Sequence, residues 1–242
     1  MLKKRGKAQV TLFIIIAIII VAIGLTVFFI EKNKIFPNNS SGTMPEIKIY
    51  TQECLNQISK EGFIAMSMQG GYTNPKNFFD SNTSKISYWY YAGSKLTPSL
   101  RTIEGEISKY IDFYLPICLS NYPKKNQTEI SFNESKTIST IQSNKIVFQT
   151  TFPIEVKTED LEFTFKDLNA EIDSNFFSMY NFASDITNQL IQNNGILPLN
   201  EGLPFDLLVV PYDQKNVVYV VVDNSTLVEG QPSILVFAAK SK

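Results

Sequence analysis

The chain has 242 residues, of which 44% are hydrophobic and 19% charged, and its net charge at pH 7 is -1. It contains no histidine, which excludes Ser-His-Asp and Cys-His catalysis, histidine general bases and every metal site that uses histidine. Its two cysteines form no CxxC pair and no GxxxxGKS/T or GxGxxG pattern occurs, which excludes a structural zinc site and the common nucleotide-binding loops. From sequence we therefore assign no catalytic residue, no cofactor and no metal site.

The N-terminus has the pattern of a membrane anchor. Residues 1–9 form a basic cytoplasmic leader with four positive side chains and no acid. Residues 10–30 carry no charge, and a helix of about 21 residues spans roughly 31 Å of hydrocarbon. The positive charge before this run predicts a single-pass protein of the cytoplasmic membrane, with its N-terminus inside and its C-terminal domain outside. A cleaved secretory signal is the alternative, but its apolar core is normally about 7 to 15 residues long.

The leader KKRGKAQ at residues 3–9, followed directly by the apolar run, resembles the start of archaeal proteins with class III, type IV pilin-like signal sequences. That resemblance implies cleavage between Ala8 and Gln9, with the helix retained. Pilins of this kind commonly carry a glutamate at the fifth mature position, which pairs with a neighbouring subunit during filament assembly, and this chain has Phe13 there. The remainder, with QGGY at 69–72 after one helix and Cys118 near the end of another, resembles uncharacterised anchored proteins of small archaeal genomes and implies no activity.

After the anchor, residues 31–43 are predicted to be a linker, because FPNNSSG is a cluster of polar and turn-forming residues. An extracytoplasmic α+β domain is predicted at residues 44–242. It is long enough for one domain, or for a helical part at 44–120 and a sheet-rich part at 121–242. Residues 1–34 hold six bases and one acid, so the remainder carries about -6, which argues against nucleic acid as a partner.

The first half of this domain is predicted to contain two helices and a strand. A helix is expected at residues 45–67, ended by Gly70-Gly71, and an aromatic strand at 87–91. A second helix is expected at 98–115, where Pro116 stops it.

The second half alternates between strands and one helix. Its periodicity predicts an antiparallel meander of strands at 137–141, 145–156 and 161–172, a helix at 175–192 ended by Asn194-Gly195, and strands at 205–211, 217–222 and 234–239. The strand at 217–222 is almost continuously apolar, so we expect it to be buried on both faces. Blocks of helices and strands in this order indicate an α+β fold.

Cys54 lies on the apolar face of the first predicted helix, and Cys118 extends the apolar face of the second just past Pro116. Helical spacing groups Ile47, Tyr50, Cys54 and Ile58 on one face, and Ile103, Ile107, Ile111, Tyr114 and Cys118 on another. Both sulfurs then point to a shared core, and outside the cytoplasm a disulfide between them is predicted. It would close a loop of about 65 residues and stabilise the fold by roughly 4 kcal/mol. The alternative is two free buried cysteines that act as small hydrophobic residues.

Six N-glycosylation sequons occur, with acceptors Asn38, Asn39, Asn82, Asn126, Asn133 and Asn224. About three are expected by chance from the frequencies of Asn, Ser and Thr, so six is a mild excess that fits a glycosylated surface protein.

Carboxylates are the remaining candidates for catalysis. The candidates are Glu104 with Glu106, and Glu159, Asp160 and Glu162. Glu104 and Glu106 lie two apart on a predicted helix and do not face each other, and Glu159 and Asp160 sit in a predicted turn. A solvated surface therefore explains both groups better than a glycosidase-like pair.

Two further groups have a functional and a structural interpretation. Asp213, Asp223 and Asn224 supply oxygen ligands suited to calcium, although turn formation explains them more simply. Tyr88, Trp89, Tyr90 and Tyr91 are expected to pack in the core in preference to forming a sugar-binding or partner-binding surface.

The sequence therefore favours a membrane-anchored cell-surface structural or interaction protein, either a pilin-like subunit or an adhesion module. The expected partners are the lipid bilayer, through residues 10–30, and either further copies or other envelope proteins. A membrane-tethered hydrolase that uses carboxylates and a ligand-binding ectodomain are the alternatives.

Overall fold

The computed structural model describes residues 43–81, 83–123, 128–158, 162–198 and 202–241. The chain divides into two units, residues 1–42 and residues 43–242, and the second is compact. The predicted leader with Ala8 and Gln9, the predicted anchor and all of the predicted linker except Thr43 lie outside the described residues. Among the helices that the structure describes, none is long and apolar enough to cross a membrane.

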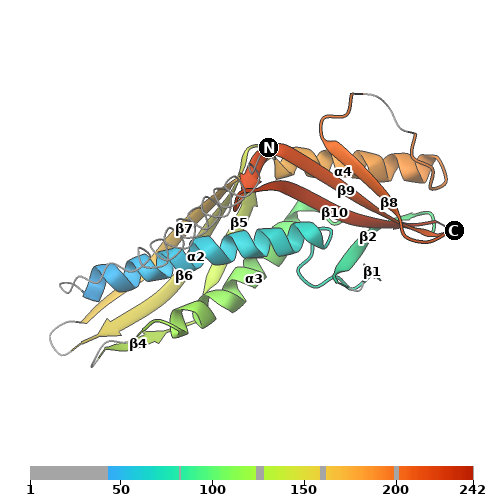
Figure 1. Ribbon diagram of the computed structural model, residues 1–242. Coiled ribbons are helices and arrows are strands. Elements are labelled where there is room, and N and C mark those ends of the chain that lie inside the picture. The colour runs from blue at the N-terminus through green and yellow to red at the C-terminus, as the bar shows by residue number, and fades with distance from the viewer. Residues whose placement is uncertain (1–42, 82, 124–127, 159–161, 199–201, 242) are drawn as a thin grey trace, which may run out of the picture. The chain divides into compact units, whose positions relative to one another are not determined.

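The predicted α+β class is confirmed for this unit (Figure 1). Its helices are α2 (Thr43–Met68), α3 (Leu100–Ser120) and α4 (Phe176–Gln192). The first sheet has the order β1-β2-β10-β9-β8, with β3 paired to β2. Its strands are β1 (Phe78–Asp80), β2 (Lys85–Tyr91), β3 (Ser94–Lys95), β8 (Asp206–Pro211), β9 (Asn216–Val228) and β10 (Gln231–Lys240). Neighbouring strands are antiparallel except β2 and β10, which are parallel.

The second sheet is built around the long strand β6 (Lys145–Lys157). Along one edge β6 pairs with β7 (Glu162–Asp173), and along the other it pairs with β5 (Lys136–Ile141) and then β4 (Glu129–Phe132). The β6–β7 register shifts between Thr151 and Ile154, so Pro153 sits in a bulge. A proline is tolerated there because a bulge already interrupts the hydrogen-bond ladder.

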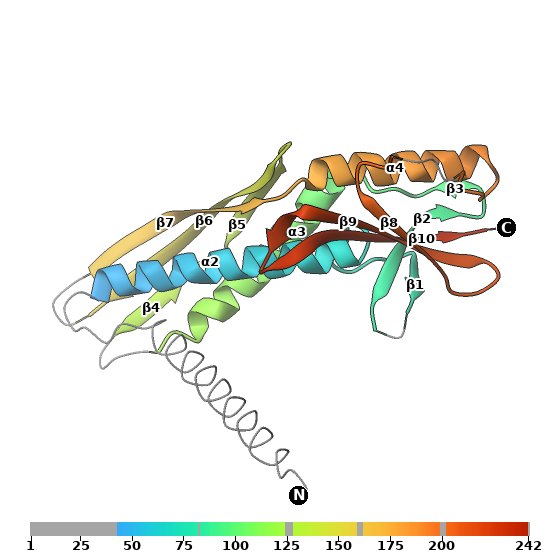
Figure 2. The same cartoon turned by 45° about the horizontal axis from the view of Figure 1, so that its top comes forward.

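The helices cover the sheets in two groups. Helices α2 and α3 run side by side over one face of the second sheet, as Figures 1 and 2 show, and the Cβ of a residue replacing Gly62 on α2 would meet the Tyr110 ring of α3 at 2.8 Å. Helix α4 packs on the first sheet, where Trp89 of β2 contacts Tyr180. Buried residues of all three helices and both sheets belong to one hydrophobic cluster, so the unit has a continuous core.

The two predicted helix ends are confirmed. Gly71 has a φ of 90° and its N–H donates to the carbonyl of Met66 at 2.9 Å; Gly195 has the same φ and its N–H donates to Leu190 at 2.7 Å. Both bonds reach back five residues, as in a Schellman motif, whose left-handed residue is the one before the donor, here Gly70 and Asn194. A Cβ on Gly71 would also meet Pro98 at 2.9 Å, so the position requires glycine.

The predicted stop at Pro116 is wrong, because α3 continues to Ser120. A proline inside a helix has no N–H for the carbonyl four residues earlier, which here belongs to Asp112. The Ser135 hydroxyl donates to that carbonyl at 3.0 Å. A side chain from the residue just before β5 therefore replaces the missing backbone donor and lets the helix continue past the proline.

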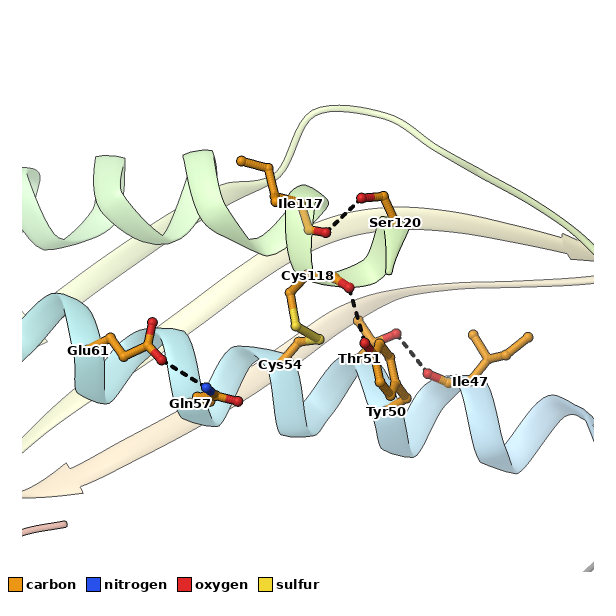
Figure 3. The surroundings of a disulfide bond; sticks show 9 residues. All are labelled: Ile47, Tyr50, Thr51, Cys54, Gln57, Glu61, Ile117, Cys118 and Ser120. Carbon is orange, nitrogen blue, oxygen red and sulfur yellow. Dashed lines mark hydrogen bonds between the residues drawn. A yellow bond between two sulfur atoms is a disulfide. The ribbon is translucent and has the colours of Figure 1, made fainter. Parts of the chain in front are cut away.

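The disulfide between Cys54 and Cys118 is confirmed, with a Cα–Cα distance of 6.0 Å (Figure 3). The Tyr50 hydroxyl donates to the carbonyl of Cys118 at 3.2 Å beside it. One member of the predicted apolar face of α3 is wrong, since Tyr114 is 41% exposed. The buried face repeats every four residues instead, through Ile103, Ile107, Ile111, Leu115 and Leu119.

The predicted strands of the meander are confirmed, but other strands were missed or shortened. The strands β1 and β3 are three and two residues long, too short for a periodic signal. Strand β4 also escaped prediction, and β9 runs to Val228, well past the predicted end at residue 222.

Replacing both cysteines by alanine should lower the free energy of unfolding by about 4 kcal/mol, because the closed loop spans 64 residues. Urea denaturation followed by the emission of Trp89, which is fully buried, measures this in the purified full chain. An unchanged urea midpoint in Cys54→Ala/Cys118→Ala would show that the bond does not constrain the unfolded chain.

The variant Ser135→Ala should lose about 1–3 kcal/mol of stability, because the carbonyl of Asp112 then lacks its donor. Ser131→Ala, at an exposed position on β4, is the matched control. In a Pro116→Ala background the restored N–H should remove most of the Ser135→Ala cost. An equal loss of stability on Ser135→Ala with and without Pro116→Ala would contradict the proposal that the Ser135 hydroxyl takes the place of the missing N–H.

Candidate interaction surface

The carboxylates of α3 bind backbone groups and do not form a catalytic pair. An oxygen of Glu104 accepts a hydrogen bond from the N–H of Ile141 at 2.9 Å. Glu106 accepts from the N–H and hydroxyl of Thr73 at 3.3 and 3.1 Å and lies 3.3 Å from the ammonium of Lys109. These carboxylates thus hold α3 to neighbouring segments. Glu162 is exposed at the start of β7, and Glu159 and Asp160 lie outside the described residues.

Glu104 belongs to a row of α3 side chains that covers the outer edge of β5. Ser108 accepts from the N–H of Ser139 at 3.1 Å. The Asp112 carboxyl accepts hydrogen bonds from the backbone and hydroxyl of Thr137. Four helical residues rise about 6 Å and two strand residues about 6.8 Å, so side chains at every fourth position of α3 match alternate N–H groups of β5. We call Glu104, Ser108 and Asp112 the α3 edge ladder.

The ionisable side chain of Asp112 was not among the residues predicted to be functional. Burial raises the pKa of its carboxyl, while the hydrogen bonds from Thr137 and Ser135 oppose that rise. Its Oδ1 is buried without a hydrogen-bond partner among the described residues. A signal was present in the four-residue spacing from Glu104 to Ser108 to Asp112, but it becomes meaningful only when β5 is known to lie beside α3.

The structure gives turn-forming roles to the residues considered for calcium. Asp213 accepts from the N–H groups of Lys215 and Asn216, each at 2.7 Å, and from the Asn216 side chain, and these bonds lower the pKa of its carboxyl. Asn224 donates to Asp206 at 2.7 Å. Within the described ranges no group of three His, Cys, Asp or Glu residues is arranged to hold a metal ion.

Asp223 lies at a bulge of β9, where the register with β10 shifts. It accepts hydrogen bonds from Ser225, Thr226 and Asn175 at 2.6 to 3.1 Å. Burial by itself would raise the pKa of this carboxyl, but those donors outweigh burial and hold the pKa below its usual range.

An open cleft of about 800 Å³ lies between α4, the start of β8 and this bulge. Asp206 and Asp223 line it together with the rings of Phe182 and Phe205. Both carboxylates already accept from side chains of the cleft wall, Asn224 and Asn175. Two of the three acidic residues that line the cleft are therefore already hydrogen-bonded by asparagines of its wall, and the third, Asp185, is exposed on α4.

The aromatic strand packs mostly as predicted. Trp89 is fully buried and its indole N–H donates to the carbonyl of Gly70 at 2.8 Å, and Tyr90 is buried in the same cluster. Tyr88 is buried on the opposite face of the sheet, while Tyr91 is 40% exposed and lies under the ammonium of Lys240. Core packing is thus the main role of this strand.

Two of the six sequon asparagines can be placed. Asn133 and Asn224 are exposed. Asn38, Asn39, Asn82 and Asn126 lie outside the described residues. The sequon serine that follows Asn133 is Ser135, whose buried hydroxyl is used by α3.

Strand β8 has an exposed surface that differs from an ordinary protein exterior. It is the last strand of the first sheet, and its sequence DLLVVP is apolar on both faces. Leu208, Val209 and Val210 are 55%, 40% and 46% exposed, and Tyr212 just beyond is 51% exposed. An apolar edge strand whose outward backbone groups are unpaired is a template for pairing with another strand.

One hydrogen bond and one proline show which backbone N–H groups of β8 point away from the sheet. The N–H of Tyr212 donates inward to Asn216 of β9 at 2.9 Å. Since N–H groups alternate along a strand, those of Leu207 and Val209 point away from β9. Pro211, which has no N–H, falls in the same outward set, as expected of a proline at an edge.

The apolar surface continues from β8 across the outer face of the sheet. Leu208 is opposite Val220 and Val210 is opposite Val218. Val218 belongs to the smaller hydrophobic cluster on this face, with Val220 and Ile234 packed against it. The sequence predicted the strand at 205–211 but gave no strand order, so it did not show that this strand lies at an edge.

Comparisons with protein-family profiles, with curated proteins and with solved structures found no match to this chain.

The raised pKa of Asp112 predicts a pH-dependent effect of Asp112→Asn. A carboxyl whose pKa is higher in the folded than in the unfolded state loses stability as the pH rises from about 4 through the folded pKa. The neutral amide has no such loss. Its stability relative to wild type should therefore increase from pH 3 to pH 7 in urea titrations. Asp167→Asn, at an exposed site on β7, controls for loss of one surface charge; a relative stability that falls with pH would contradict the buried-carboxyl assignment.

Proposed function

We propose that this chain is a membrane-anchored cell-surface structural protein that associates with a second copy of itself through β8. The apolar, unpaired edge of β8 is the observation that carries the proposal. The uncharged run at residues 10–30 and the basic leader support the anchor, and the paired cysteines fit an oxidising exterior.

The contrast between β5 and β8 supports a protein partner. The outward N–H groups of β5 are bonded by the α3 edge ladder, whereas β8 has no such cover from the described residues. Lipid offers no hydrogen-bonding groups to a strand edge, so burial of β8 in a bilayer would leave its backbone unsatisfied. A second β-strand satisfies both the backbone and the apolar side chains.

The pattern of β8 suits a second copy of the same strand. If a two-fold axis passes through Leu208, the outward residues Leu207 and Val209 pair with Val209 and Leu207 of the other copy. Each such pair exchanges two backbone hydrogen bonds, so the contact between the two β8 strands contains four backbone hydrogen bonds. A two-fold arrangement closes after two copies, whereas open repetition would form a fibre. This assembly does not require the glutamate that pilins carry at the position of Phe13, because the contact between the copies lies in the folded domain.

The hydrolase alternative receives less support. Glu104 and Glu106 accept hydrogen bonds from separate segments, and those bonds explain both residues structurally.

The test is intermolecular crosslinking of Leu208→Cys in the purified full chain. In the proposed register the two Leu208 residues face each other as a non-hydrogen-bonded pair with Cα atoms about 4.5 Å apart, within disulfide range. The native cysteines are already paired with each other. Mild oxidation should therefore give a reducible dimer on non-reducing gels.

Leu227→Cys is the matched control, since this leucine is 60% exposed and lies near the β9–β10 turn. It should stay monomeric under the same oxidation. Equal crosslinking of both variants, or a monomer for Leu208→Cys together with a monomeric mass in sedimentation, would reject pairing through β8.

A further inference from the structure

Helix α3 carries a second apolar surface, which is exposed to solvent and is separate from its buried face. Tyr110, Phe113, Tyr114 and Ile117 follow the spacing i, i+3, i+4, i+7 and so lie on one side of the helix. Phe113, Tyr114 and Ile117 are 63%, 41% and 46% exposed. The ring of Tyr114 lies 4.5 Å from that of Tyr110 and 4.9 Å from that of Phe113. We call these four residues the α3 aromatic stripe.

The core does not explain the α3 aromatic stripe. The core face of α3 is already complete, with five aliphatic side chains that are at most 1% exposed. A surface helix normally presents polar residues on its other side. Between Tyr110 and Asn121 the one carboxylate is Asp112, which binds β5, and there is no lysine or arginine. Charged side chains border only the N-terminal end of the stripe, where Glu61 of α2 lies near Tyr110 and Lys109 pairs with Glu106. A cluster of large apolar side chains with charges only at one end marks a surface that meets another apolar phase.

The position of the stripe relates it to the start of the domain. Ile117 precedes Cys118, whose disulfide partner Cys54 lies eleven residues after Thr43, the first residue of α2. Figure 3 shows Ile117 pointing away from α2 beside this bond. Twelve residues separate Thr43 from the apolar run at 10–30, and such a segment reaches at most about 40 Å. The C-terminal end of the stripe is therefore near the point at which the domain is tethered.

We propose that the α3 aromatic stripe inserts into the interfacial layer of the bilayer that holds the anchor; this rests on the membrane anchor of the proposed function. A helix satisfies its own backbone hydrogen bonds, so its side chains face lipid without orphaned polar groups, which β8 could not do. Tyrosine combines an apolar ring with a hydroxyl and is enriched at membrane–water interfaces. Peripheral helices bind membranes with such an apolar face.

Docking by this stripe gives the domain a defined orientation. The layer of α2 and α3 then faces the membrane, and the outward residues of β6 and β7, which are largely polar, face solvent. The tether limits the search to the membrane surface, so a small apolar patch is sufficient for binding.

The experiment places a tryptophan in the stripe of the full chain, reconstituted into phosphatidylcholine vesicles with and without brominated acyl chains. Phe113→Trp is suitable because the position is exposed, and the native Trp89 is fully buried and supplies a constant background. Most of the emission added by Phe113→Trp should be lost in brominated vesicles. Leu227→Trp, at a similarly exposed residue, should keep its added emission. Tyr114→Trp repeats the test at the neighbouring position.

Flotation of the same vesicles separates the two proposals. If the chain floats with the lipid but Phe113→Trp and Tyr114→Trp are not quenched, the anchor stands and the docking is wrong. If the chain does not float, the anchor fails and the docking fails with it. A blue-shifted emission that brominated lipid does not quench and that grows with protein density would assign the stripe to a second copy, which also overturns the proposal.

Discussion

The α3 edge ladder is the constraint on which the arrangement of the domain depends. Glu104, Ser108 and Asp112 bond successive outward N–H groups of β5, so the helix is fixed in register along the strand. A shift of one residue in either element would break every rung at once, because the strand alternates with period two. Ser135 and the Cys54–Cys118 bond then extend this fixation to the end of α3 and across to α2. One helix thus covers an edge, joins the second sheet to α2 and carries an apolar stripe on its free side.

The sequence was informative where the physical signal is local. The periodicity of α2 and α4, the glycines that end them and the β5–β6–β7 meander all follow from residues within a few positions of each other. Pro116 shows where this fails, since a rule that holds for an isolated helix was overridden by a hydroxyl nineteen residues away in sequence. The edge position of β8 and the exposure of the α3 aromatic stripe depend on strand order and helix packing, which a single sequence does not encode locally.

The two apolar surfaces suit different partners, because the backbone of β8 has unpaired hydrogen-bonding groups and the backbone of α3 does not. At β8 the unpaired groups of Leu207 and Val209 require hydrogen bonds, and only a polypeptide supplies them in the right spacing. On α3 the backbone hydrogen bonds are already made within the helix, so the side chains determine the partner. Exposed aromatic residues with charges only at one end of the stripe suit a lipid interface. A domain that lies on the membrane through one helix and exposes a sheet edge elsewhere is able to associate with another copy while both remain anchored.

The measurement that tests the account most directly is the intact mass of the chain taken from its native membrane, alkylated first without and then with reduction. The proposed anchoring requires a domain outside the cytoplasm, where Cys54 and Cys118 are paired. The chain should therefore carry no alkyl groups before reduction and two after it. Two alkyl groups before reduction would show free thiols in the native protein and would contradict both the disulfide and the exterior location.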